Sequence, residues 1–168
     1  QVAFLKVLHP ILKASGLNTV ISASEETDAA QSVRDFEGYQ AAEVLPLVGQ
    51  WNTHTYSATT QARSQISALC KEQGIRLWMS EVGSGGSGIA GNLNLAQKLM
   101  DDIRYIMPVA WVDWQYVEEG NDQWCLVQGD FTKQTYHKVK NYSIRQHFSK
   151  FIRPGYTFLT SLNGQTLA

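Results

Sequence analysis

Glu81 is the residue whose surroundings point most clearly to chemistry. It lies near the end of an apolar segment, residues 75–82, and a glycine-rich stretch follows it. A carboxylate among buried strand residues costs free energy unless partners compensate for its lost hydration. Glycines let the chain turn away and leave room for a ligand near the backbone. The position favours a catalytic or binding carboxylate, and the alternative is a solvated side chain at the start of a loop.

His54 and Tyr56 form a second candidate group. They are two residues apart in a predicted strand, so their side chains point to the same face. They could bind a polar ligand, although His54 could equally be a hydrogen-bonded structural residue. In parallel α/β folds the functional edge is the carboxyl end of the strands. The predicted strand ends that carry polar or aromatic groups are Ser24 to Glu26, Asn52 to Tyr56, Ser80 to Gly83 and Trp111 to Tyr116.

The elements that would position these residues alternate along the chain. Apolar residues at helical spacing predict four helices, and short β-branched apolar segments predict a strand after each helix. The predicted helices are 2–14, 29–44, 60–74 (capped by Thr59 or Thr60) and 89–103, and the predicted strands are 17–23, 47–56, 75–82 and 106–116. This alternation indicates an α/β fold with a parallel sheet. Such a sheet is either open and doubly wound or half of a (β/α)8 barrel, because a full barrel needs about 250 residues.

The segment after the fourth predicted strand has weaker patterns. A turn-rich stretch predicts a hairpin around 119–122, and apolar spacing predicts a last helix over 135–148. The tail, residues 155–167, is predicted to form one or two strands.

Composition excludes several classes of protein. The 168 residues are 43% hydrophobic and 17% charged, which is a globular profile. The 14 basic and 15 acidic residues provide no excess of positive charge for nucleic acid. No apolar run reaches the roughly 18 residues of a membrane span, and the four histidines are too scattered to suggest a metal site. Cys70 and Cys125 could form one disulfide or remain free thiols.

A glycine motif supports a competing interpretation. Gly83, Gly85 and Gly88 match the G-x-G-x-x-G pattern of a dinucleotide-binding turn between a strand and a helix. However, Glu81 would place a negative charge beside the pyrophosphate. The acid expected about 20 residues later would be Asp101 or Asp102, which lie inside a predicted helix. A dinucleotide-binding α/β domain is therefore the second interpretation.

Four segments resemble glycoside hydrolase family 30, especially its members that act on β-1,6-galactan and β-1,6-glucan. The segments are Trp51 to Tyr56 (WNTHTY), Leu77 to Gly83 (LWMSEVG), Ala110 to Gln115 (AWVDWQ) and Phe148 to Tyr156 (FSKFIRPGY). The resemblance implies a retaining β-glycoside hydrolase built on a TIM barrel with a flanking β-sandwich. Residues 1–148 would be the C-terminal half of the barrel, strands five to eight, and residues 149–168 would begin the flanking β-region.

The resemblance also implies roles for individual residues. Glu81 corresponds to the catalytic nucleophile at the end of strand seven. His54 and Tyr56 correspond to strand-six residues beside the sugar, and Trp111 or Trp114 would stack on a sugar face. The substrate would be a β-linked polysaccharide of the galactan, glucan or xylan class. No cofactor is implied, because the mechanism uses carboxylates and water, and a secreted or periplasmic location follows from the resemblance.

One part of the family's pattern is missing. The general acid/base glutamate of the family lies in an Asn-Glu-Pro-like motif at the end of strand four, and this sequence has no such motif. Glu25 and Glu26 end a different strand, so the resemblance gives them no such role. The sequence therefore predicts a portion of an enzyme that is inactive or weakly active alone, with a carbohydrate-binding remnant as the alternative. A half-barrel would expose strand edges and an apolar inner face, so a missing N-terminal half-barrel or a second copy is expected to cover it.

Overall fold

The computed structural model describes residues 1–83 and 88–159, which fall into two compact units. The first unit comprises Gln1–Val82 and Tyr105–Val112, and the second comprises Gly83–Arg104 and Asp113–Ala168. Elements of the first unit are α1 (Val2–Ala14), β1 (Ser22–Glu26), α2 (Ala29–Ala41), the 3-10 helix η1 (Leu45–Leu47), β2 (Gln50–His54), α3 (Thr60–Glu72), β3 (Arg76–Val82) and most of β4 (Ala110–Asp113).

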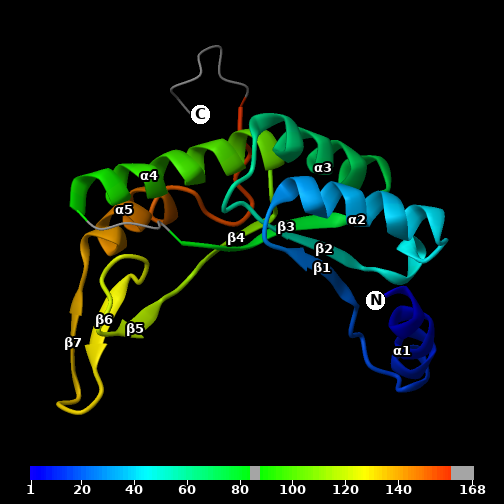
Figure 1. Cartoon of the computed structure of the whole chain (residues 1–168), viewed down its shortest axis with the longest axis horizontal. Coiled ribbons are helices and arrows are strands. Elements are labelled where there is room, and N and C mark those ends of the chain that lie inside the picture. The colour runs from blue at the N-terminus through cyan, green and yellow to red at the C-terminus, as the bar shows by residue number, and fades with distance from the viewer. Residues whose placement is uncertain (84–87, 160–168) are drawn as a thin grey trace. The chain divides into compact units, whose positions relative to one another are not determined.

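The four strands lie in the sheet in their chain order, β1-β2-β3-β4. β1 pairs with β2 and β2 with β3 in parallel, while α2 and α3 pack side by side over one face (Figure 1). Side-chain caps start both helices, from Asp28 for α2 and from Thr59 for α3. A doubly wound sheet reverses its strand order at a switch point. The sequential order therefore contradicts the sheet that a dinucleotide-binding domain requires, and Gly85 lies outside the described residues.

Trp51 organises the packing between the sheet and the helices. It is fully buried on β2, and its ring meets Phe36 and Tyr39 of α2 edge to face, with ring centroids 4.9 and 5.3 Å apart. Its Nε1 donates a hydrogen bond to Ser32 Oγ at 2.8 Å. Since side chains alternate along a strand, this contact assigns one face of β2 to the helices and the other to Asn52 and His54.

The face that α2 and α3 leave uncovered is mainly polar. Gln50 Nε2 donates to Ser22 Oγ at 3.2 Å and to Asn52 Oδ1 at 2.9 Å, so neighbouring strands are linked across this face by side chains. Trp78, which is paired in register with Asn52, is a half-buried apolar side chain on the neighbouring strand. The expectation of an apolar inner face is therefore not met at β2, because its residues on this side, Gln50, Asn52 and His54, are all hydrophilic.

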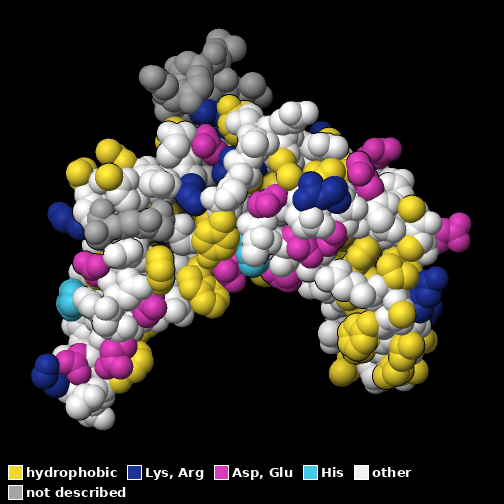
Figure 2. Space-filling model, viewed as in Figure 1, with side chains coloured by type: hydrophobic (Ala, Val, Ile, Leu, Met, Phe, Trp, Pro, Cys, Tyr) yellow, Lys and Arg dark blue, Asp and Glu magenta, His cyan; other side chains and the backbone are white. Residues whose placement is uncertain are grey.

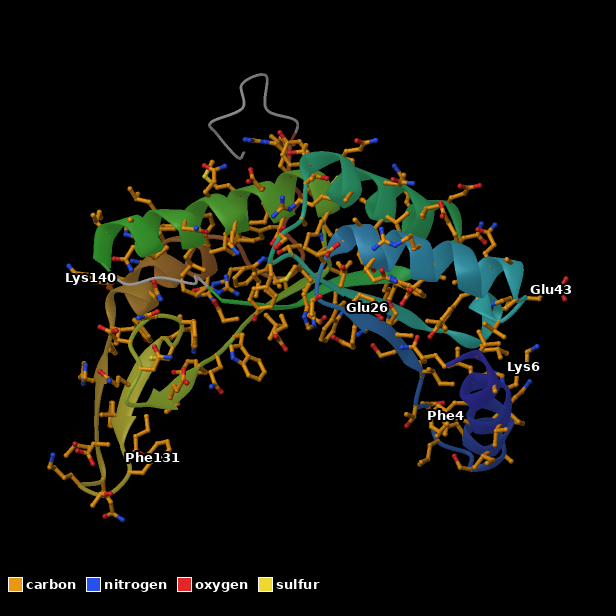
Figure 3. All side chains as sticks on the ribbon, in the orientation of Figure 1. Phe4, Lys6, Glu26, Glu43, Phe131 and Lys140 are labelled. Carbon is orange, nitrogen blue, oxygen red and sulfur yellow. The ribbon has the colours of Figure 1, made fainter. Side chains whose placement is uncertain are left out.

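The first helix differs, because it leaves apolar side chains in water. Leu5 of α1 is buried, while Phe4, Val7 and Ile11 are each 60% exposed or more. These side chains gather over α1 in Figure 2, and Figure 3 labels Phe4 among them. None of the helices in the described ranges is long and apolar enough to cross a membrane.

The second unit contains α4 (Gly88–Asp101), β5 (Val117–Glu119), β6 (Val127–Asp130), β7 (Thr135–Lys138) and α5 (Lys140–Ser149); the π-helical turn η2 (Asp102–Ile106) follows α4. α4 and α5 pack together, and Asn92 Nδ2 donates to Asn141 Oδ1 at 2.8 Å between them. The three strands form a separate sheet in the order β5-β6-β7.

Two predictions for this unit are wrong. No hairpin forms around 119–122, because β5 pairs with β6 in parallel rather than turning back on itself. The predicted helix over 135–148 begins only at Lys140, because residues 135–138 pair with β6 as the antiparallel strand β7. Residues 155–159 contain no strand, and the rest of the predicted β-tail lies outside the described residues.

Candidate active site

The first unit brings two carboxylates to the imidazole of His54. Glu25 of β1 and Glu81 of β3 lie on either side of His54, which ends the strand between them and is only 8% exposed. Nε2 lies 3.1 Å from Glu25 Oε2, within hydrogen-bonding distance, and Nδ1 lies 3.7 Å from Glu81 Oε1. The carboxyl ends of three neighbouring strands thus meet at one histidine, as the sequence predicted for two of these residues.

Tyr56 completes the surroundings of Glu81. Its hydroxyl donates a hydrogen bond to Glu81 Oε1 at 3.0 Å, and its ring lies edge to face with His54, with centroids 6.0 Å apart. The Glu81 side chain is 28% exposed, so a molecule in solution can reach it. A carboxylate oriented by a phenol and accessible from solution can act as a nucleophile or as a base.

The carboxylate of Glu25 has more hydrogen-bond partners than that of Glu81. Besides the His54 contact, its carboxylate accepts hydrogen bonds from Asn52 Nδ2 and, at 2.8 Å, from Ser80 Oγ. Its side chain is nevertheless 47% exposed. Sequence reasoning noted Glu25, Asn52 and Ser80 at strand ends but gave none of them a role, because the resemblance pointed to other positions.

Two β-bulges set the directions in which these side chains point. Between β1 and β2 the register shifts across Glu25, and between β2 and β3 it shifts so that Ser80 is the extra residue. Glu25 also has a φ of 69°, in the left-handed region that residues other than glycine seldom adopt. A bulge turns a side chain away from the strand alternation, and bulges are common beside active sites. Neither bulge could be predicted from the sequence.

Glu26, one residue further along the same strand, interacts mainly with Asp35 and less strongly with His54. Its pKa is raised by a hydrogen bond with Asp35, by burial and by repulsion from the Asp35 carboxylate. Figure 3 labels Glu26 at the end of β1. Within the described ranges, no group of three His, Cys, Asp or Glu side chains could hold a metal ion.

The two tryptophans predicted to stack on sugar differ in their surroundings. Trp111 is half-buried and packs against the hydrophobic core of the first unit. Trp114 belongs to the second unit and is 45% exposed. Their stacking role stays a prediction. Between them in sequence, Asp113 accepts a hydrogen bond from Arg145 Nε at 2.8 Å, within the second unit.

Two characterised glycosidases are similar in sequence. The chain is 26% identical over 155 residues to an endo-β-1,6-galactanase of Hypocrea rufa, and this covers 92% of the chain but 31% of the galactanase. It is 30% identical over 109 residues to an exo-β-1,6-galactobiohydrolase of Bifidobacterium longum, which covers 61% of the chain and 7% of that enzyme. No family model matches the sequence. The chain thus spans about a third of the galactanase and less of the galactobiohydrolase.

Solved structures share the fold. The catalytic domain of a family 30 xylanase from Talaromyces cellulolyticus matches 91% of the chain with a TM-score of 0.74 and 21% identity, and the match covers 36% of that domain. An endo-β-1,6-glucanase matches with a TM-score of 0.66 and 22% identity, over 92% of the chain and 39% of the enzyme. The parallel sheet therefore corresponds to part of a family 30 catalytic domain, and the chain is related to the glycoside hydrolases of family 30.

Proposed function

We propose that this chain supplies the nucleophile side of the active site of a retaining β-glycoside hydrolase, with Glu81 as the nucleophile. The observation that carries this is the placement of Glu81 at a strand end, hydrogen-bonded to Tyr56, facing His54 and open to solvent. Its carboxylate would attack the anomeric carbon of a sugar and form a covalent glycosyl-enzyme. Tyr56 and His54 would orient that carboxylate or hold the sugar.

The substrate class follows from the relatives. The similar enzymes act on β-1,6-linked galactose polymers and, among the solved structures, on β-1,6-glucan and xylan. We propose a β-linked polysaccharide of this range as the substrate, with secretion as its corollary. The aromatic floor under the sugar would come from Trp111 or Trp114, and Trp114 is the more exposed of the two.

The barrel position is also part of the proposal. The resemblance of the strand-end segments supports an assignment of β1 to β4 to barrel strands five to eight, and the sequential sheet order fits four consecutive strands of a barrel. In a retaining glycosidase a second carboxyl group, about 5–5.5 Å from the nucleophile, protonates the leaving oxygen. Glu25 is held by His54, Asn52 and Ser80, so we place the general acid/base outside these 168 residues, on the missing N-terminal half-barrel.

An activated substrate tests the nucleophile without the general acid. A deoxyfluoro-β-galactoside with a dinitrophenolate leaving group needs no protonation to depart, because dinitrophenolate is a stable anion. Incubation with the chain, supplemented with an N-terminal half-barrel that completes the site, is expected to add one fluorosugar to Glu81, as detected by intact mass and peptide mapping. The variant E81Q should not be labelled, and the control E26A should be labelled like the wild type.

Two results would contradict the proposal. Labelling at another carboxylate would reassign the nucleophile. Binding of galacto-oligosaccharide without any labelling, under conditions that label a family 30 enzyme, would identify the chain as a carbohydrate-binding remnant.

A further inference from the structure

We propose that Glu25 is a positioning residue for the reaction proposed above, acting on Glu81 through His54. The inference rests on the proposed function, because it concerns how the nucleophile is held. The contact that carries it is the hydrogen bond between His54 Nε2 and Glu25 Oε2 at 3.1 Å. The opposite ring nitrogen, Nδ1, lies 3.7 Å from the carboxylate of Glu81.

Three side chains from the neighbouring strands fix Glu25 itself. Asn52 Nδ2 and Ser80 Oγ donate to it, and His54 Nε2 is the third partner. Hydrogen bonds to a charged carboxylate are roughly twice as strong as those between neutral groups. A carboxylate that is almost half exposed is thereby held in one orientation, which a merely solvated glutamate would not be.

The backbone is distorted where this carboxylate is presented. Glu25 is the extra residue of one bulge and Ser80 of the next, and the two side chains bond to each other. Glu25 also occupies a left-handed conformation with φ 69°. Such conformations persist where the surrounding structure enforces them, and they cluster at functional sites. Two adjacent distortions that converge on one carboxylate indicate a function for that carboxylate.

The hydrogen bond at Nε2 determines the ring orientation and the tautomer of His54 beside Glu81. When Nε2 carries the proton that Glu25 accepts, the ring orientation and the tautomer are set, as in carboxylate-histidine pairs elsewhere. Nδ1 is buried and has no hydrogen-bond partner among the described residues. It is therefore held beside the nucleophile instead of being bonded to a structural group. Glu25 thus sets the orientation of the ring that lies beside Oε1 of Glu81, the oxygen to which Tyr56 also donates.

The tautomer of His54 is the first readout. Long-range proton-nitrogen correlation spectra of the 15N-labelled chain should show a proton on Nε2 of His54 in the wild type. In E25A this preference should be lost, whereas the neighbouring control E26A should keep it. A neutral His54 protonated on Nδ1 in the wild type would overturn the proposal, whatever the activity.

Labelling of Glu81 by the activated fluorosugar is the second readout. We expect E25A to be labelled about tenfold more slowly than wild type, the loss expected when one charge-assisted hydrogen bond is removed. E25D, which keeps a carboxylate and tolerates positive φ, should recover part of the rate, and E26A should be unchanged. If wild type and E25A are labelled equally fast, the positioning role fails while the proposed function stands. If wild type is not labelled at all, the proposed function itself fails.

Discussion

The hydroxyl of Tyr56 donates a hydrogen bond to Oε1 of Glu81, the same carboxylate oxygen that faces Nδ1 of His54. The oxygen is thereby held between a phenol and an imidazole on the face of the sheet that the helices leave open. Because Tyr56 is 39% exposed, its contribution to the stability of the fold is small, and its hydroxyl can be tested by substitution.

Removing that hydroxyl should slow the attack of Glu81. In Tyr56→Phe we expect fluorosugar labelling of Glu81 to fall about tenfold, because hydrogen bonds to charged groups are worth about 1.5–3 kcal/mol. The measurement is the rate of mass increase at a fixed reagent concentration. Tyr136→Phe, which removes a hydroxyl from an exposed tyrosine on β7, is the control. If Y56F is labelled as fast as the wild type, the Tyr56 hydroxyl does not contribute to the reaction of Glu81.

The Glu26 carboxylate should lower stability at neutral pH. Its pKa in the folded chain is raised, chiefly by the hydrogen bond with Asp35. Its contribution to stability is thus fully present below the ordinary glutamate pKa of about 4.3 and is lost as the pH rises through the folded value. Glu26→Gln should therefore raise the urea midpoint at pH 7, by the equivalent of about 0.5 kcal/mol.

The gain from Glu26→Gln should shrink towards pH 4, where Glu26 is protonated in the wild type as well. Glu37→Gln, which removes an exposed carboxylate of α2, is the control and should shift neither midpoint. An equal gain at both pH values would mean that repulsion from Asp35 is not its source.

The ion pair between Asp113 and Arg145 should stabilise the second unit. Both side chains are largely buried, and burial raises the pKa of Asp113 while Arg145 lowers it. Arg145→Met leaves a buried carboxylate without this cation and should cost about 3 kcal/mol at neutral pH. The cost should decrease in acid, because the raised pKa lets Asp113 take up a proton. Chemical denaturation at several pH values measures both effects.

An exposed ion pair in the same unit provides the comparison. Lys133 Nζ lies 2.8 Å from Asp130, with the lysine side chain 77% exposed. Lys133→Met should cost less than about 1 kcal/mol, because water screens exposed pairs. The double variant D113N/R145M should recover much of the stability lost in R145M. If R145M and K133M lower the free energy of unfolding equally, the buried ion pair contributes no more to stability than the exposed one.

Cys70 should be unreactive while the chain is folded. Both cysteines are free, and burial raises the pKa of the Cys70 thiol to about 12. Since the thiolate is the reactive form, iodoacetamide at pH 8 should modify Cys70 only after urea unfolds the chain. Mass spectrometry of the alkylated peptides measures this. Rapid modification of Cys70 without urea would contradict the burial.

The sequence was sufficient for the elements of the first unit. Helix 2–14 was predicted with its observed limits, and Thr59 caps α3 as expected. Three strands were placed correctly but two of them are clearly shorter than predicted, whereas the first, predicted over 17–23, pairs over Ser22–Glu26 and so includes polar residues that the pattern assigned to a loop. In the second unit, strand pairing overrode helical spacing at residues 135–138. That pairing joins residues five to eleven positions apart, which helical spacing does not report.

The candidate site was predicted in part for a related reason. His54 and Tyr56 follow from strand alternation, and their contacts with Glu81 agree with that prediction. Glu25 was passed over because its orientation depends on a bulge and on a left-handed backbone, neither of which leaves a sequence signature. Polar side chains on alternate residues of β2 could have warned that the open face is hydrophilic.

The left-handed backbone at Glu25 lowers the stability of the fold at a position where a carboxylate is proposed to serve the reaction. An ordinary side chain in this conformation costs about 1–2 kcal/mol, which glycine would avoid. Glycine at this position would relieve that strain, but it would leave the buried side chains of Asn52 and His54 without their carboxylate partner. The retention of Glu25 in a lineage would indicate selection on the reaction rate, and its replacement by glycine or asparagine would indicate that this selection has relaxed.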